Sequence, residues 1–302
     1  MKQHKTLEIV ILGGDHRQVE LIRKLQQLSV HVTIIGFDKL ENSFVSVKKE
    51  AIDAYPFEKA DALFLPVSGV LDNGELTAVF SHDTLSFTTE MLKRTKKECK
   101  IYTGIITNTL DTMLEEVPRE VTVLFDRDDL AIYNSIPTSE GALFLAMKYT
   151  DFTIHGSKVA ILGFGRIALS LLRTFQALQA EAIVFARKSS QLARAYEMGA
   201  KVYPLDEMKE RMRDVDICLN TIPAPVLTKE VLTSMPLHTF ILDLASAPGG
   251  TDFTFAKQRG MNAILAPGIP GMIAPRTAGK ILADVCVERI TSDFFKGSGA
   301  EC

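Results

Sequence analysis

One arrangement of residues occurs twice in this chain of 302 amino acids: a short apolar run, a glycine turn, an amphipathic stretch with helical spacing, and a second apolar run. It reads LEIVILGGDHRQVELIRKLQQLSVHVTIIGF at 7–37 and KVAILGFGRIALSLLRTFQALQAEAIVF at 158–185. Strands that alternate with helices form parallel sheets with helices on both faces. The sequence therefore predicts an α/β protein with two Rossmann-like lobes, each built on a parallel sheet.

The remaining apolar runs complete the two lobes. Further strands of the first lobe are predicted at 62–66, 99–105 and 121–125. Strands of the second lobe are predicted near 158–162, 182–185, 201–203, 216–220, 239–243 and 262–265. Six strands alternating with helices are typical of a complete dinucleotide-binding domain. We assign residues 136–271 to that domain, and residues 1–135 plus 272–302 to a flavodoxin-like substrate lobe.

Two segments are predicted to join the lobes. NSIPTSEGALFLAMKYT at 134–150 reads as a crossing helix with Pro137 in its first turn, where the missing N–H costs little. A helix belonging wholly to the first lobe is the alternative. After the last strand, a turn rich in Pro and Gly precedes an amphipathic stretch, which predicts a C-terminal return helix packed on the first lobe. Two connections would leave a hinged cleft, a common place for a substrate.

The second glycine turn has the spacing of a dinucleotide site. Gly163-x-Gly165-x-x-Ala168 follows a strand and opens a helix, so backbone N–H groups at the helix N-terminus can receive a pyrophosphate. A plain tight turn is the alternative. The next strand ends in Arg187, Lys188 and Ser189, where an NAD site carries an acid for the ribose. A guanidinium and hydroxyl groups suit a 2′-phosphate, so the sequence predicts NADP, unless the two cations are only exposed charges.

Further cofactor contacts are expected at the carboxyl ends of the later strands, because ligands of open α/β sheets lie there. The segments are CLNTIPAP at 218–225 and DLASAPGG at 243–250. Either segment also reads as an ordinary turn. The candidate cofactor-binding residues are Gly163, Phe164, Gly165, Arg166, Ile167, Arg187, Lys188, Ser189, Asn220, Thr221, Pro223 and Ser246.

The first glycine turn, GGDHRQ at 13–18, lacks a third spaced glycine, and no acid ends the strand after it. We therefore interpret this lobe as one without a nucleotide of its own. A cation such as Arg17 at a helix N-terminus opposes the helix dipole, and a bound carboxylate would offset that cost. Asp15 is either a functional group or only a helix cap. The candidate substrate-binding residues are Arg17, Ser68, Arg276 and Thr277, and the candidate catalytic residues are Asp15 and His16.

The composition excludes several classes of protein. The formal charge of −3 argues against nucleic-acid binding, and the basic runs at 48–49 and 93–97 read as solvated helix faces. Neither a secretory signal nor a membrane span is predicted. No metal site is predicted from the four separated cysteines, Cys99, Cys218, Cys286 and Cys302. Free thiols favour a cytoplasmic location, and a homo-oligomer is expected.

Taken together, these motifs resemble the A subunit of bacterial dipicolinate synthase over nearly the whole length. The resemblance rests on ILGGDHRQVELIRKL, IPTSEGALFLAM, ILGFGRIA, NTIPAPVL, DLASAPGG and APGIPGMIAPRTAG. It implies NADP-dependent oxidation of dihydrodipicolinate to dipicolinate in the mother cell of a spore former. It also implies a partner, the flavoprotein B subunit of the same synthase. The implied substrate has two carboxylates, for which Arg17 and Arg276 would be the sockets.

Other functions remain as alternatives. A methyltransferase would place an acid where Arg187 stands, and a 2-hydroxy-acid dehydrogenase would place a histidine in the loop at 266–275, which has none. The substrate motif of shikimate dehydrogenases is absent from the first lobe. A non-catalytic NADP-binding regulatory protein, or a dehydrogenase of another small carboxylic acid, stays open.

Overall fold

The computed structural model describes residues 6–41 and 44–295. The chain divides into two compact units, of which the first runs to Leu130 and resumes at Pro275, and the second spans Ala131–Ala274. Cys302 lies outside the described residues, and the other three cysteines are buried free thiols. Within the described ranges, no helix is both long and apolar enough to cross a membrane.

The first unit contains a six-stranded sheet in the order β3-β2-β1-β4-β7-β8, with every neighbouring pair parallel. Its strands are β1 (Leu7–Leu12), β2 (Val30–Ile35), β3 (Val47–Glu50), β4 (Ala62–Phe64), β7 (Lys100–Thr103) and β8 (Glu120–Val123), with a separate hairpin of β5 (Glu75–Leu76) and β6 (Leu85–Ser86). Its helices are α1 (His16–Leu25), α2 (Thr89–Arg94), α3 (Asn108–Glu116) and α11 (Pro275–Ile290).

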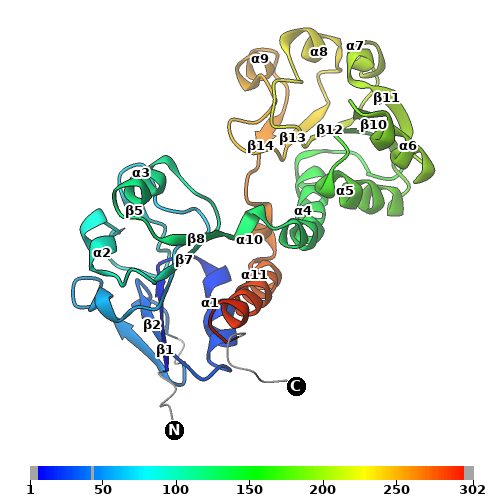
Figure 1. Cartoon of the computed structure of the whole chain (residues 1–302). Helices are drawn as coiled ribbons and strands as arrows, with labels where there is room; N and C mark the ends of the chain where they lie inside the picture. Colours follow the sequence, from blue (N-terminus) through cyan, green and yellow to red (C-terminus); the bar gives the residue numbers. More distant parts are fainter. Residues whose placement is uncertain (1–5, 42–43, 296–302) are drawn as a thin grey trace. The chain divides into compact units, whose positions relative to one another are not determined.

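Alternate residues of β1 enter two different cores, as the two-residue period of a strand requires. Ile9 and Ile11 join the core that α1 and α11 complete, while Val10 and Leu12 join the core beneath α2 and α3. The helices α1 and α11 lie side by side (Figure 1). They approach closely because a Cβ on Gly279 would lie 2.9 Å from the Cα of Arg17.

The strand order corrects two predictions for the first unit. With β3 at the edge, the sheet has the Rossmann order rather than the flavodoxin-like order. Lys48 and Lys49 lie on this strand and not on a helix face. The strand pairs only with β2, and lysines on an edge strand discourage pairing with other chains.

The second unit contains the other six-stranded sheet, in the order β11-β10-β9-β12-β13-β14, again wholly parallel. Its strands are β9 (Lys158–Leu162), β10 (Glu181–Ala186), β11 (Lys201–Pro204), β12 (Ile217–Asn220), β13 (Phe240–Asp243) and β14 (Ala263–Leu265). Its helices are α5 (Arg166–Ala177), α6 (Ser189–Glu197), α7 (Met208–Arg211), α8 (Lys229–Ser234), α9 (Phe253–Gln258) and α10 (Ile269–Ile273). The predicted α/β class with two parallel sheets is confirmed.

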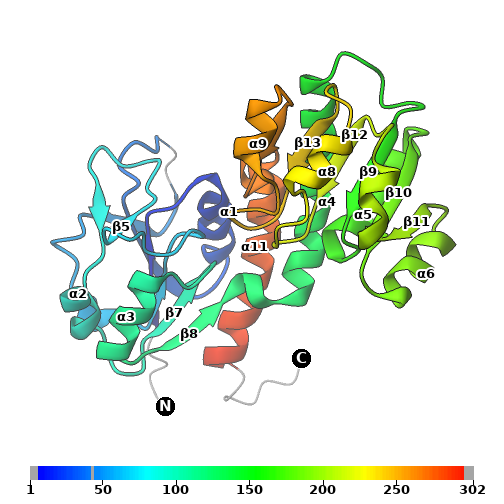
Figure 2. The ribbon, with the colours of Figure 1, turned by 90° about the horizontal axis from the view of Figure 1, so that it is seen from above.

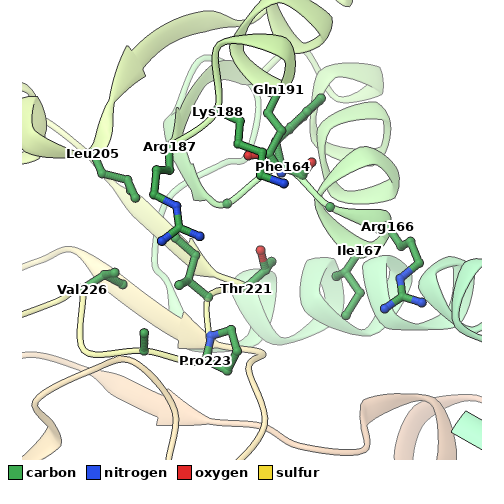
Figure 3. A pocket seen from close by; sticks show the side chains of 14 residues that line it. Phe164, Arg166, Ile167, Arg187, Lys188, Gln191, Leu205, Thr221, Pro223 and Val226 are labelled. Carbon is green, nitrogen blue, oxygen red and sulfur yellow. Dashed lines mark hydrogen bonds between the residues drawn. The ribbon is translucent and has the colours of Figure 1, made fainter. Parts of the chain in front are cut away.

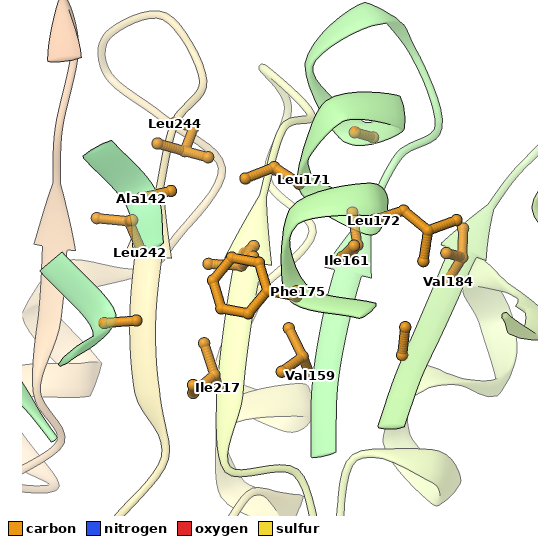
Figure 4. Close-up of a cluster of buried hydrophobic side chains, with 14 of the residues drawn as sticks. Ala142, Val159, Ile161, Leu171, Leu172, Phe175, Val184, Ile217, Leu242 and Leu244 are labelled. Carbon is orange, nitrogen blue, oxygen red and sulfur yellow. The ribbon is translucent and has the colours of Figure 1, made fainter. Parts of the chain in front are cut away.

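The core of the second unit fixes the position of α5. Val159 and Ile161 of β9 point to the face that α5 covers with Leu171 and Phe175 (Figure 4). Figure 2 shows α5 against β9 and β10. Because α5 is held along its length, its first turn is fixed at the carboxyl end of β9.

The crossing helix α4 (Asp128–Tyr149) starts earlier than predicted and continues from the first unit into the second. Pro137 lies inside it rather than in its first turn, so the predicted position of the proline is wrong. Proline there removes one backbone hydrogen bond of the helix. The hydroxyl groups of Ser135 and Thr138 donate to nearby backbone carbonyls, those of Ile132 and Asn134.

Candidate functional site

The glycine turn after β9 leaves the first turn of α5 open. Gly163 has φ +84°, and a Cβ there would lie 2.7 Å from the hydroxyl oxygen of Thr221, so this position requires glycine. Gly165 is the N-cap of α5 and no side chain caps the helix. A Cβ on Gly165 would meet no atom within 4 Å. The N–H groups at this end of α5 therefore border open space, as anion binding requires.

A cavity of about 600 Å³ adjoins this turn (Figure 3). Three segments of the second unit build it: the glycine turn, the junction of β10 with α6, and the loop after β12. Its lining residues are Gly163, Phe164, Gly165, Arg166, Ile167, Arg187, Lys188, Gln191, Leu205, Thr221, Ile222, Pro223, Ala224 and Val226. It lies at the carboxyl edge of the sheet, where a Rossmann fold receives its dinucleotide.

Two cations border the cavity at the junction of β10 with α6. Arg187 directs its guanidinium group into the cavity (Figure 3), and Lys188 is the N-cap residue of α6. No side chain caps α6, which begins at Ser189. Across residues 6–41 and 44–295, neither cation makes an ion pair with a carboxylate. The residues present therefore fit a dinucleotide, with two cations available for an additional anionic group.

Sequence reasoning missed Gln191 and several apolar lining residues. The side-chain amide of Gln191 donates to the carbonyl oxygen of Phe164 at 3.2 Å, and so links α6 to the glycine turn. Leu205 and Val226 line the cavity from segments after β11 and β12. The position of Gln191 one turn after Lys188 was a usable signal, whereas no motif marks Leu205 or Val226.

Three predicted cofactor residues do not line the cavity. Asn220 is fully buried, and its side chain bonds to Asp243 and to the backbone of Ile222. Its amide is thus engaged inside the protein rather than presented to a ligand. Ser246 and Ser189 are exposed and lie outside the lining.

The first unit uses its own chain to fill the equivalent turn. The N–H of Gly14 donates to the carbonyl of Thr77 at 2.6 Å, and the N–H of Val79 donates to the carbonyl of Gly14 at 3.1 Å. A Cβ on Gly13 would lie 2.7 Å from the same Thr77 oxygen. The segment at 77–79 thus lies where a nucleotide would approach this turn, which fits the interpretation of a lobe without its own nucleotide.

Asp15 and Arg17 form an ion pair at the start of α1. Arg17 donates to both carboxylate oxygens of Asp15, with a shortest distance of 2.6 Å. Burial alone would raise the pKa of Asp15, but the hydrogen bonds and charge of Arg17 outweigh it and hold the pKa below its usual value. Asp15 also caps α1 in a capping box with Gln18. The carboxylate that offsets the cost of Arg17 at a helix N-terminus is therefore Asp15, and no bound carboxylate is needed for that purpose.

His16 and Arg276 line a second cavity of about 330 Å³ within the first unit. The imidazole of His16 packs edge-on against the ring of Phe80, with centroids 4.9 Å apart. The other lining residues are Val19, Glu20, Arg23, Leu40, Phe80 and Pro275. Thr277 is not among them, and Ser68 is hydrogen-bonded to the hydroxyl of Thr77 at 2.8 Å.

Comparison with known proteins identifies both units. Residues 8–125 match the family model for the N-terminal domain of the A subunit of dipicolinate synthase. Residues 138–245 match the model "D-isomer specific 2-hydroxyacid dehydrogenase, NAD binding domain". The chain is 48% identical to the dipicolinate synthase A subunit of Bacillus subtilis over 279 residues, which cover 92% of this chain and 94% of that protein.

Solved structures give the same result. The crystal structure of the dipicolinate synthase A subunit from Bacillus halodurans has a TM-score of 0.91 and 47% identity, covering 94% of this chain and 97% of that chain. The Bacillus subtilis structure has a TM-score of 0.90 and 46% identity, covering 96% and 97%. A transhydrogenase from Sinorhizobium meliloti, with a TM-score of 0.66 and 14% identity over 94% and 93%, shares the fold.

The second unit is therefore a dehydrogenase-type domain for a nicotinamide cofactor, and its glycine turn and cavity provide the site. With nearly half of its residues identical over almost the full length of a known relative, the chain belongs to the family of dipicolinate synthase A subunits.

Proposed function

We propose that this chain oxidises dihydrodipicolinate to dipicolinate (pyridine-2,6-dicarboxylate) with NADP as the hydride acceptor. The division of labour follows the two lobes, with residues 136–271 holding the cofactor and residues 1–135 plus 272–302 holding the substrate. The observation that carries the proposal is the presence of two cations without ion-pair partners, Arg187 and Lys188, at the cofactor cavity of a member of this family.

The choice of NADP rests on charge. Arg187 and Lys188 stand where an NAD-specific domain has an acid, and the open N-terminus of α6 adds the positive end of a helix dipole. Ser189 and its neighbour Ser190 add hydroxyl groups at the same place. A 2′-phosphate would satisfy all three features, whereas the 2′-hydroxyl of NAD would leave the cations without a partner.

The substrate assignment rests on the first unit. The bound cofactor supplies a hydride acceptor, so the chain's own task is to orient a dicarboxylate and to remove one proton as the ring becomes aromatic. Arg276 can hold a carboxylate beside the aromatic edge of Phe80, and His16 in the same cavity is the better placed proton acceptor. Asp15 is already engaged with Arg17 and the helix cap, so its role would be to fix Arg17. Ser68 and Thr277 remain candidates for polar contacts.

The assembly is part of the proposal. The curated relative is named as one component of a synthase with more than one kind of polypeptide, and we propose the flavoprotein B subunit of dipicolinate synthase for the partner of this chain. We also propose a homo-oligomer in the cytoplasm of the mother cell of a sporulating bacterium.

A spectrophotometric assay tests the proposal. The purified chain is mixed with NADP and freshly made substrate precursor, with and without the flavoprotein, and with NAD as the control. NADPH and dipicolinate should appear together, and far more slowly with NAD. NADP binding without turnover in either mixture would instead favour a non-catalytic regulatory role, and turnover of a different acid would favour another dehydrogenase.

A further inference from the structure

A buried carboxylate ends the central strand of one half of the cofactor sheet. Asp243 is the last residue of β13 and has 0% of its surface exposed. One of its oxygens accepts from the side-chain amide of Asn220 at 3.0 Å and from the N–H of Ala245 at 3.1 Å. The other oxygen accepts from the N–H of Gly250 at 2.8 Å and from the hydroxyl of Thr251 at 2.6 Å.

All four donors to Asp243 are neutral. Two are backbone N–H groups, one is an amide and one is a hydroxyl, and donors that converge on both oxygens are the pattern that an ionised carboxylate accepts. Across residues 6–41 and 44–295, no Lys, Arg or His lies in ion-pair contact with Asp243. The negative charge is therefore solvated by the protein but not cancelled by a neighbouring positive charge.

Asp243 is connected to the wall of the cofactor cavity through two short chains of hydrogen bonds. Its partner Asn220 accepts from the N–H of Ile222 at 3.0 Å and donates to the carbonyl of Ile222 at 3.1 Å. Its partner Gly250 accepts at its carbonyl from the N–H of Val226 at 3.0 Å. Ile222 and Val226 both line the cavity. The carboxylate thus lies directly behind the loop that follows β12.

The position of Asp243 in the sheet places it in the nicotinamide half of the site. A Rossmann sheet consists of two mononucleotide-binding halves that share one dinucleotide. Arg187 and Lys188 follow β10 and mark the half that takes the adenosine end. The second mononucleotide then belongs to the half made by β12, β13 and β14, of which β13 is the middle strand.

We propose that Asp243 is a positioning residue whose buried charge also sets the preference of the site between the two oxidation states of the cofactor. The inference rests on the proposed binding of NADP. The oxidised nicotinamide ring carries a positive charge and the reduced ring carries none. A fixed negative charge in a medium of low dielectric constant therefore stabilises the oxidised form more than the reduced form. This is the direction that an enzyme using NADP as oxidant requires.

The test measures the dissociation constants of NADP and NADPH separately and compares their ratio, oxidised over reduced. Isothermal titration calorimetry serves for NADP, and the fluorescence of the nicotinamide serves for NADPH. Replacing the carboxylate in Asp243→Asn should raise this ratio about tenfold, the order of magnitude of one unscreened charge acting through protein. Thr251→Val is the matched control, because it removes one hydrogen bond from the same carboxylate and keeps the charge. This variant should leave the ratio within about twofold of the wild-type value, even if both cofactors bind more weakly.

Each outcome decides between interpretations. An equal weakening of NADP and NADPH in Asp243→Asn would overturn the charge effect and leave a residue that only supports the loop. If that variant does not fold, the wild-type ratio decides, because the inference requires NADP to bind more tightly than NADPH, and the reverse order overturns it. Failure of the wild-type chain to bind either form would contradict the proposed function itself.

Discussion

The side-chain amide of Gln191 donates a hydrogen bond of 3.2 Å to the carbonyl of Phe164, so the first turns of α6 are linked to the glycine turn of α5. The two segments supply different parts of the proposed cofactor site, the cations Arg187 and Lys188 on one side and the open helix N-terminus on the other. A change at Gln191 should therefore affect the cofactor even if the side chain never touches it.

Gln191→Leu should weaken NADP binding by about three- to tenfold, because the loss of one hydrogen bond leaves the glycine turn less well fixed. Gln176→Leu is the matched control, since Gln176 also donates to a backbone carbonyl, that of Met198 at 3.0 Å, but does not line the cavity. Fluorescence titration with NADPH measures both. Equal affinities for the two variants would show that the Gln191–Phe164 link does not organise the site.

Arg187→Ala and Lys188→Ala test the choice of cofactor. Loss of Arg187 should cost about ten- to a hundredfold in NADP affinity and leave NAD affinity nearly unchanged, because only the 2′-phosphate meets the guanidinium group. Arg194→Ala serves as the control, because this arginine lies on the same helix but pairs with Glu197. A parallel loss of NAD and NADP binding would mean that Arg187 contacts a part common to both.

The two glycines of the turn after β9 should respond in opposite ways. Gly163→Ala should lower the free energy of unfolding by at least about 1 kcal/mol, since an L-residue is strained at φ +84° and its Cβ would lie 2.7 Å from Thr221. Gly165→Ala has room for the new methyl group and should change stability by only a few tenths of a kcal/mol. The same methyl group would occupy the space of a bound pyrophosphate, so this variant should lose cofactor affinity instead. Urea unfolding and NADPH titration of both variants check the pair of expectations, and a Gly165 variant with full affinity would contradict the proposed position of the pyrophosphate.

The strands of the second unit were predictable because each is an apolar run between turn residues and is buried on both faces. The edge strand β3 was not, since VKKE has one neighbouring strand and needs no apolar face. The start of α4 was missed for a related reason: Pro137 indicates a helix start in a sequence, but here hydroxyl groups within the helix bond to the carbonyls around it.

The glycine turn and its cations could be found from spacing, because both belong to one local motif. Asn220 was assigned to the cofactor because it is polar and ends a strand, yet its register places it opposite Asp243 in the neighbouring strand. Register between two strands is a property of the folded sheet and is not written in either segment. The same holds for Gln191 and Leu205, which reach the cavity only after the helices have packed.

The ion pair of Asp15 and Arg17 makes a prediction about pH. The pKa of Asp15 is held below its ordinary value of 3.8 in the folded protein, so the charged carboxylate stabilises the fold at neutral pH, and this contribution is lost as the pH falls through the folded pKa. Asp15→Asn keeps an N-cap side chain but removes the charge. It should lower the free energy of unfolding by about 1 kcal/mol at pH 7, after allowance for partial exposure of the pair, and by progressively less below about pH 4. Urea unfolding across this pH range measures the difference, with the exposed Asp53→Asn as a control that should show no such trend. A difference between wild type and Asp15→Asn that stays constant from pH 7 to pH 3 would mean that the cap geometry, and not the charge of the pair, stabilises the start of α1.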